Sequence, residues 1–280
     1  MINKLAAFLL LATVAWGSGA AARPYDQVIA SGSLRVAVYR DFPPFASGTD
    51  DKLRGVDVDL GAAIAKKLGV KVEYMNQTAG ESVDDDLRNA VWKGHYLGGG
   101  VADLMLHIPV DSQLALRNDN AVIFAPYFQE QVVVLVDPAQ TGGDDLVGAF
   151  AEHKVGVELD SLGDLYMVGA YGGSLRENVV HFPNIAAAVE GMQRGEVAGV
   201  VGTRGEIEGA LGSKRGKYHL GSMPMPGLQR GSWPIGMAVK VNAHDLANAI
   251  EPIVDGMIKD GSLAKIFAKH GLSYRPAPVE

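Results

Sequence analysis

The histidines, serines and acidic residues of this chain form none of the common catalytic patterns. There is no His-Glu-x-x-His segment, and the absence of cysteine excludes a thiol nucleophile. The nearest match to the Gly-x-Ser-x-Gly turn of hydrolases, Leu159-Asp-Ser-Leu-Gly163, lacks the leading glycine. Gly98-Gly99-Gly100 is not followed by the Lys-Ser/Thr pair of a phosphate-binding loop. Because the seven histidines also lack metal-ligand spacing, we predict neither an enzyme nor a metal site.

The first 22 residues have the pattern of a bacterial export signal. Lys4 provides the positive start, and the apolar run from Leu5 to Trp16 is too short to span a bilayer. Ala20-Ala21-Ala22 offers the small residues that signal cleavage requires. The chain has no cysteine for lipid attachment, so we predict a freely diffusing periplasmic protein; a retained N-terminal anchor is the alternative. The net charge of −7 argues against nucleic-acid binding.

Apolar strands alternate with amphipathic helices in two successive series. The first series has strands at 34–39, 70–75 and 102–108 with helices at 57–68 and 84–93. The second has strands at 154–159, 179–182 and 197–201 with helices at 163–171 and 185–194. This alternation predicts an α/β protein with two lobes, each a doubly wound sheet.

Two β-prone runs, at 131–136 and 235–241, are the predicted crossings between the lobes. Helices at 245–259 and 262–270 would then return to the first lobe, and the tail from Tyr274 to Glu280 is expected to be loose. The predicted division is a signal at 1–22, lobe 1 at 23–131 plus 235–280, and lobe 2 at 132–234. A hinge of two strands would let the lobes close over a ligand.

Several short motifs resemble, in order and spacing, those of family 3 periplasmic solute-binding proteins. The resemblance covers nearly the whole chain after the signal. It implies the type II periplasmic-binding-protein fold, a monomer, and delivery of a ligand to the permease of an ABC transporter. The motifs are Leu34 to Phe45 with its Phe42-Pro-Pro-Phe45 end, Gly55-Val-Asp-Val-Asp-Leu60, Phe124-Ala-Pro-Tyr127, Gly195 to Val201, Trp233 to Val239 and Asp260 to Ile266.

The resemblance also places a ligand between the lobes, at the carboxyl ends of the strands. The positions in this sequence that match the family's site, or lie beside it, offer cations, aromatic rings and a helix start. They are Tyr39, Arg40, Phe42, His107, Arg117, Ser161, Thr203, Arg204 and Trp233.

Two of these positions depart from the pattern of amino-acid binders. The family has an aspartate, which holds the ligand's α-amino group, where this chain has Thr203 followed by Arg204. The carboxylate often found at the position of Tyr39 is also missing, and Arg40 follows. Guanidinium groups bind carboxylates in a bidentate manner, so we predict a flat polyanionic ligand.

A narrower resemblance concerns the segment from Ala102 to Asp111, which is similar to solute-binding-like proteins associated with quinoprotein alcohol dehydrogenases. It implies such a dehydrogenase as partner, or its cofactor pyrroloquinoline quinone as ligand; no cofactor is required by the fold itself. The alternatives are an accessory protein of the dehydrogenase without a ligand, an amino-acid-binding transport protein, and a cyclic-acid dehydratase that uses Glu158 or Asp160.

Some acidic and aromatic residues have simpler structural interpretations. Asp57 and Asp59 are expected to cap the helix that they begin. The run Asp84–Asp86 is expected to be a solvated helix start, and Trp92 and Trp233 are the kind of residue that more often packs than binds.

Overall fold

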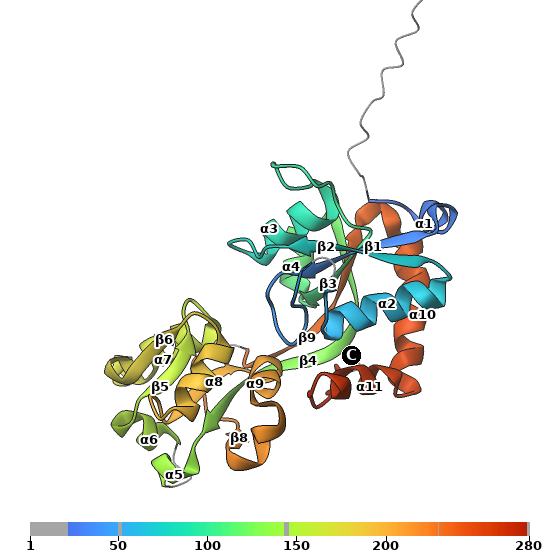
Figure 1. Cartoon of the computed structure of the whole chain (residues 1–280). Helices are drawn as coiled ribbons and strands as arrows, with labels where there is room; N and C mark the ends of the chain where they lie inside the picture. Colours follow the sequence, from blue (N-terminus) through green and yellow to red (C-terminus); the bar gives the residue numbers. More distant parts are fainter. Residues whose placement is uncertain (1–21, 50–51, 143–145, 229, 279–280) are drawn as a thin grey trace, which may run out of the picture.

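The computed structural model describes residues 22–49, 52–142, 146–228 and 230–278. The chain forms two α/β lobes connected by strands that run through both of them (Figure 1). The strands follow the order β2 (Lys71–Gln77), β1 (Ser33–Tyr39), β3 (Leu104–Pro109), β9 (Ser232–Lys240), β4 (Ala121–Val136), β7 (Gly199–Thr203), β5 (Val155–Glu158) and β6 (Val179–Phe182), with β8 (His219–Gly221) beside β4. Residues 1–21 of the predicted export signal lie outside the described part. Within that part, the model contains no helix with the length and hydropathy needed to cross a membrane.

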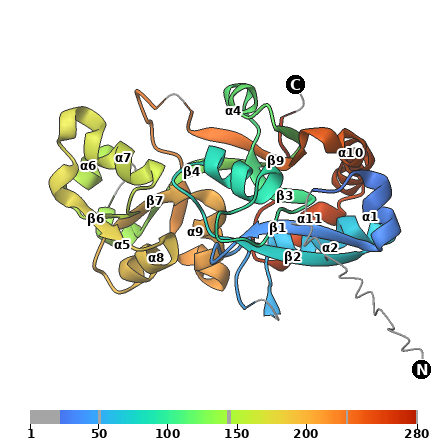
Figure 2. The same cartoon turned by 90° about the horizontal axis from the view of Figure 1, so that it is seen from above.

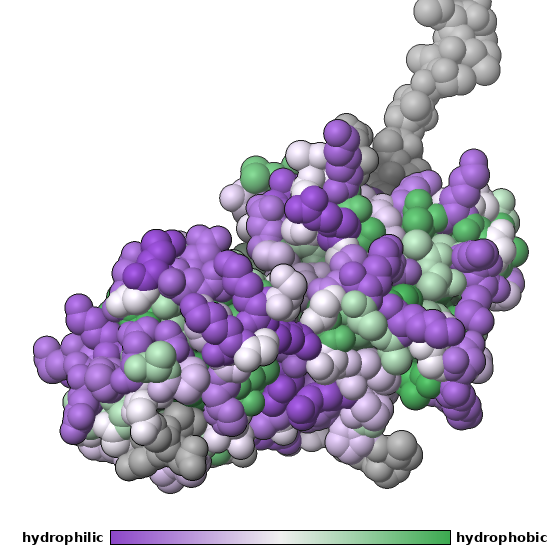
Figure 3. Space-filling model, turned by 60° about the horizontal axis from the view of Figure 1, so that its bottom comes forward, coloured by the Kyte–Doolittle hydropathy of each residue, from purple (hydrophilic) through white to green (hydrophobic). Residues whose placement is uncertain are grey.

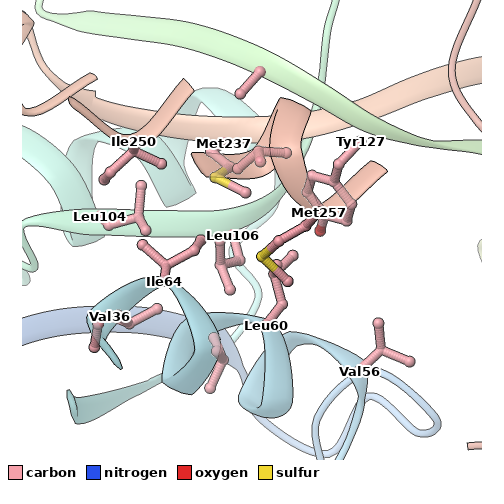
Figure 4. Close-up of a cluster of buried hydrophobic side chains, with 14 of the residues drawn as sticks. Val36, Val56, Leu60, Ile64, Leu104, Leu106, Tyr127, Met237, Ile250 and Met257 are labelled. Atoms are coloured by element: carbon pink, nitrogen blue, oxygen red, sulfur yellow. The ribbon is translucent and has the colours of Figure 1, made fainter. Parts of the chain in front are cut away.

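Lobe 1 contains the parallel strands β1 (Ser33–Tyr39), β2 (Lys71–Gln77) and β3 (Leu104–Pro109). Alternate residues of β1 face opposite sides of the sheet, so Val36 and Val38 pack in one buried cluster and Ala37 in another. The first cluster also holds side chains of α2 (Val56–Leu68), α10 (His244–Lys259) and α11 (Ser262–Lys269) (Figure 4).

The second cluster of lobe 1 lies on the other face of its sheet. It holds side chains of α3 (Val83–Leu87) and of the π-helical turn that follows it, Arg88–Trp92. Both faces of the lobe 1 sheet are therefore covered, as is usual for parallel sheets.

Lobe 2 repeats this arrangement with β5 (Val155–Glu158), β6 (Val179–Phe182) and β7 (Gly199–Thr203). Its helices α7 (Leu162–Gly169), α8 (Ile185–Gln193) and α9 (Arg204–Leu211) each start just after a strand. In the view from above, α7 and α8 lie on either side of the lobe 2 strands (Figure 2). The sequence did not lead us to predict α9, which lies beside the hinge.

The two lobes are joined by β4 (Ala121–Val136) and β9 (Ser232–Lys240). These strands pair antiparallel from Ala121↔Lys240 to Gln131↔Ser232, and β4 then pairs with β7 from Val132↔Thr203. Two long strands thus form the connection, and the lobe boundaries given above stay a prediction. The remaining elements are α1 (Tyr25–Ser31), α4 (Ser112–Arg117), α5 (Pro138–Thr141), α6 (Leu146–Glu152) and β8 (His219–Gly221).

The C-terminal segment after α11 differs from the expectation of a loose tail. Tyr274 packs against the main core cluster, and its hydroxyl donates a hydrogen bond of 3.0 Å to the carbonyl of Tyr127. The amide of Gln129 donates one of 2.9 Å to the carbonyl of Arg275. The tail is therefore bound to β4 through residue 275.

Candidate ligand-binding cleft

Two adjoining cavities lie between the lobes, with volumes of about 390 and 720 Å³. They share four lining residues, Asp41 and Phe42 from lobe 1 and Glu158 and Thr203 from lobe 2. Since both lobes contribute to both cavities, we treat them as one cleft. It lies at the carboxyl ends of β1, β3, β5 and β7, where open α/β sheets bind ligands.

The lobe 1 wall of the cleft carries the carboxylate of Asp86. We expected this residue to be solvated, but it is buried. Asp86 is 3% exposed, and it accepts hydrogen bonds from the Tyr39 hydroxyl (2.8 Å) and the Gly80 amide (2.7 Å). Burial raises the pKa of Asp86. The interpretation of this residue as part of a solvated helix start is therefore wrong, because the hydroxyl and the amide provide the partners that water would otherwise provide.

His107 stands at the end of β3 with a left-handed backbone (φ 62°) and lines the smaller cavity. Its ring packs against Phe42 and Phe45, at centroid distances of 5.0 and 4.2 Å. Its Nδ1 lies 3.2 Å from Oδ2 of the fully buried Asp57, whose Oδ1 accepts a hydrogen bond of 3.1 Å from Tyr127. His107 thus lines the cleft and lies beside a buried carboxylate.

The capping role expected for Asp57 and Asp59 is wrong. The N-cap of α2 is Gly55, and no side chain caps that helix end. Asp57 points to Tyr127, whereas Asp59 accepts from Lys269 at 2.7 Å and lies 2.7 Å from Nε2 of His270. Both carboxylates therefore bind to parts of the chain that are far away in the sequence.

Glu130, in the hinge strand β4, is a second buried carboxylate in the cleft. It is 2% exposed, and it accepts hydrogen bonds from the amides of Gln131 (2.7 Å) and Gly205 (3.3 and 3.4 Å). Burial raises the pKa of Glu130 to about 7. The side chain therefore occupies the start of α9, a place that would otherwise attract an anionic ligand.

Lobe 2 contributes Thr203, Glu206 and Glu158 to the cleft. The Thr203 hydroxyl donates a hydrogen bond of 2.6 Å to Oε2 of Glu206, and burial raises the pKa of Glu206 to about 8. Burial also raises the pKa of Glu158. Ser161 lines the larger cavity and caps α7 by accepting from the Asp164 amide at 3.1 Å.

Only some of the basic residues that we predicted for the site line the cleft. Arg40 and His107 line the smaller cavity, together with Trp233. Arg117 is 58% exposed and lies 3.5 Å from Asp84, outside both cavities. Arg204 is turned away from the cleft toward Glu208, at 3.5 Å. Arg117 and Arg204 therefore do not form the cation-rich cleft that the sequence suggested.

Acidic side chains outnumber basic ones among the described residues that line the cleft. Its basic side chains are Arg40 and His107, and its acidic side chains are Asp41, Asp86, Glu130, Glu158 and Glu206. Sequence reasoning missed Glu130 and Glu206 as site residues. Thr203-x-x-Glu206 has the spacing of a helix capping box, which would have indicated both α9 and this carboxylate. Nothing in the sequence around Glu130 indicates that the residue is buried.

Comparisons with known proteins find one family model that matches part of the chain and several solved structures with a similar fold. Residues 34–90 match the model of the bacterial extracellular solute-binding proteins, family 3. No curated protein matches the chain. Among solved structures, an ancestral cationic amino acid solute-binding protein is 21% identical with a TM-score of 0.70, and the match covers 89% of this chain and 99% of that one. An ancestral arginine-binding protein bound to arginine is 26% identical with a TM-score of 0.57, over 85% and 97% of the two chains.

A third similar structure is the solute receptor for L-cysteine of Neisseria gonorrhoeae, which is 18% identical with a TM-score of 0.60 over 89% and 93% of the two chains. The described chain therefore has the two-lobed α/β fold of the type II solute-binding proteins. Its residues 34–90 carry the sequence of family 3 of these proteins, which confirms the family resemblance for that part of the chain. The narrower resemblance to proteins of quinoprotein dehydrogenases stays a prediction.

Proposed function

We propose that the whole chain is a family 3 solute-binding protein that is exported, closes over a small solute with a positively charged group, and delivers it to the permease of an ABC transporter. The observation that carries the proposal is the charge of the cleft. Five carboxylates line it, against Arg40 and His107. The family model and the two-lobed fold support the transport role.

A positively charged group is the natural partner of the buried carboxylates. Burial raises the pKa of Glu130 to about 7 and that of Glu206 to about 8, because removal from water disfavours the negatively charged form, which a nearby positive charge would stabilise. A bound ammonium or guanidinium would supply that charge, and each charge-assisted hydrogen bond contributes about 1.5–3 kcal/mol. Two such bonds are a large part of the roughly 8 kcal/mol of micromolar binding.

The rest of the cleft suits a short organic solute. Tyr39, Phe42 and Trp233 supply apolar and aromatic surface, and Arg40 is the one guanidinium available to a ligand carboxylate among the described lining residues. An amino acid with a cationic side chain has this distribution of charge. Two of the similar solved structures are described as binding arginine or cationic amino acids, which supports the same choice.

The same charges disfavour the polyanionic ligand that the sequence suggested. A tricarboxylate such as pyrroloquinoline quinone would meet Asp41, Glu158 and Glu206, and among the described lining residues it would find the basic side chains of Arg40 and His107. Like charges at close range in a partly buried site cost free energy. The cleft therefore suits a cationic solute better than the flat polyanion that the sequence suggested.

Calorimetric titration of the mature chain tests the proposal. L-arginine and L-lysine are the cationic probes, and L-glutamate and pyrroloquinoline quinone are the anionic ones. We expect micromolar binding of at least one cationic probe and none of the anionic probes at comparable concentration. Tight binding of L-glutamate or of the quinone, without binding of either cation, would contradict the proposal.

A further inference from the structure

The C-terminal segment after α11 connects lobe 1 to lobe 2 a third time, beside the two hinge strands. α11 belongs to lobe 1, where Phe267 is fully buried in the core and Lys269 binds Asp59 of α2 at 2.7 Å. The segment that follows contacts lobe 2 through Gly271 and Ser273 and then binds β4 through Tyr274 and Arg275. In Figure 1, α11 lies below β4, whereas α3 and α4 lie above it.

The contact with lobe 2 is built around the buried carboxylate of Glu208. Its Oε2 accepts hydrogen bonds from the Ser273 amide at 2.7 Å and lies 2.8 Å from Nη2 of Arg215. Arg215 also donates to Oγ of Ser273 at 3.2 Å and to the carbonyl of Gly271. We call Glu208, Arg215, Gly271 and Ser273 the back latch. In the back latch, the Glu208 carboxylate and the Arg215 guanidinium of lobe 2 bind the segment that follows α11 of lobe 1.

The back latch and the cleft contact opposite faces of the same helix. Thr203, Glu206 and Gly209 line the larger cavity. At 100° per residue, Glu208 lies about 200° around α9 from Glu206, on the far side from the cleft. In Figure 3, which brings the underside of Figure 1 forward, strongly hydrophilic side chains gather where the two lobes meet.

We propose that the back latch holds the cleft open and thereby lowers the affinity of the ligand-free protein for its ligand. Closure rotates lobe 2 about β4 and β9 and carries the cleft face of α9 toward lobe 1. The opposite face of α9 then moves away from residues 271–273, so the hydrogen bonds of Glu208 and Arg215 to this segment must break. A contact that exists only in the open state shifts the equilibrium toward that state. This inference goes beyond the proposed function, since it does not depend on which solute binds.

The test is Arg215→Ala, which removes the two bonds from the guanidinium to the tail and leaves the Ser273 amide and Arg204 to pair with Glu208. The chain has no cysteine, so spin labels attached at Glu81→Cys and Leu165→Cys report the distance across the cleft. In the ligand-free protein we expect the population with the short distance to rise about three- to tenfold, as expected for the loss of partly exposed charge-assisted bonds.

Arg194→Ala is the matched control, because Arg194 is an exposed arginine of lobe 2 that pairs with Glu190 and Glu196 of the same lobe. It should leave the distance distribution unchanged. Ser273→Ala removes one acceptor of Arg215 at an exposed position and should shift the distribution in the same direction by a smaller factor. An unchanged or longer distance in both Arg215→Ala and Ser273→Ala, in protein that is folded by circular dichroism, would overturn the inference.

Discussion

The hydroxyl of Thr203 donates a hydrogen bond of 2.6 Å to the carboxylate of Glu206, in the wall of the cleft and at the start of α9. Thr203 stands where amino-acid binders of the family are expected to carry an aspartate. Glu206 brings a carboxylate to the same wall, one helical turn further along the chain. The cleft wall therefore offers a carboxylate to a ligand cation at Glu206, although position 203 itself is not acidic.

Glu206→Gln should weaken the binding of L-arginine at least tenfold, because it removes a carboxylate but keeps the shape of the side chain. Loss of one charge-assisted hydrogen bond, about 1.5–3 kcal/mol, gives this factor. Glu190→Gln is the control, since Glu190 is 70% exposed and pairs with Arg194 in the same lobe. Calorimetry measures both; equal affinities of the two variants would remove Glu206 from the site.

The affinity for L-arginine should rise with pH between about pH 6 and 9. Glu130 and Glu206, with pKa values raised by burial to about 7 and about 8, must lose their protons before they can balance a cation. Titrations at several pH values in buffers of different ionisation enthalpy should also show protons released on binding. A flat pH profile would contradict the assignment of these two carboxylates.

The stability of the ligand-free protein should fall over part of the same range. A carboxyl group whose pKa is higher in the folded than in the unfolded protein binds more protons when folded, so stability decreases as pH rises from about 4.5 toward the folded value. We therefore expect Tm to fall from pH 5 to pH 8, with a smaller fall in Glu206→Gln. Thermal unfolding followed by circular dichroism measures this, and a Tm that falls equally in both proteins would exclude Glu206 as a source.

Gly209→Ala should destabilise the protein by about 1–3 kcal/mol, the usual cost of overpacking. A Cβ at Gly209 would meet Cγ of Pro44 at 2.7 Å, where the loop of lobe 1 packs on α9. Gly256→Ala in α10 is the control, because its Cβ would meet nothing within 4 Å. It should stabilise by about 0.5–1 kcal/mol. Urea unfolding distinguishes the two signs, and stabilisation by both variants would show that the loop does not pack tightly on α9.

Tyr127→Phe should cost about 1–3 kcal/mol, because it leaves the fully buried Asp57 without its hydroxyl donor. Tyr96→Phe changes the same chemical group at a position that is 88% exposed and should be neutral within about 0.5 kcal/mol. Urea unfolding of the two variants gives the comparison. A neutral Tyr127→Phe would mean that Asp57 finds another donor.

The sequence predicted the fold well where local patterns and tertiary packing agree. The strand expected at 34–39 is observed as Ser33–Tyr39, and the helix expected at 57–68 as Val56–Leu68. The hinge strand was predicted only from residue 131, whereas β4 starts at Ala121. The strand continues past Pro126, which lies where the pairing of β4 with β9 shifts register between Phe124 and Phe128.

The sequence predicted the walls of the cleft better than its charge. Tyr39, Phe42, His107 and Thr203 do line the cleft, because the ends of the strands fix their places. The direction in which Arg204 points and the burial of Glu130 depend on contacts with residues that are far away in the sequence. The C-terminal segment takes part through Ser273, whose amide binds Glu208, the partner of Arg204. The short proline-rich sequence of this segment did not indicate that it is ordered.

Calorimetric titration of residues 23–280 with L-arginine and with L-citrulline tests the binding of a cationic solute in the cleft most directly. The two amino acids have nearly the same shape, but the side chain of citrulline is neutral. We expect arginine to bind at least tenfold more tightly than citrulline, because its guanidinium pairs with the carboxylates that line the cleft. Equal affinities, or tighter binding of citrulline, would contradict it.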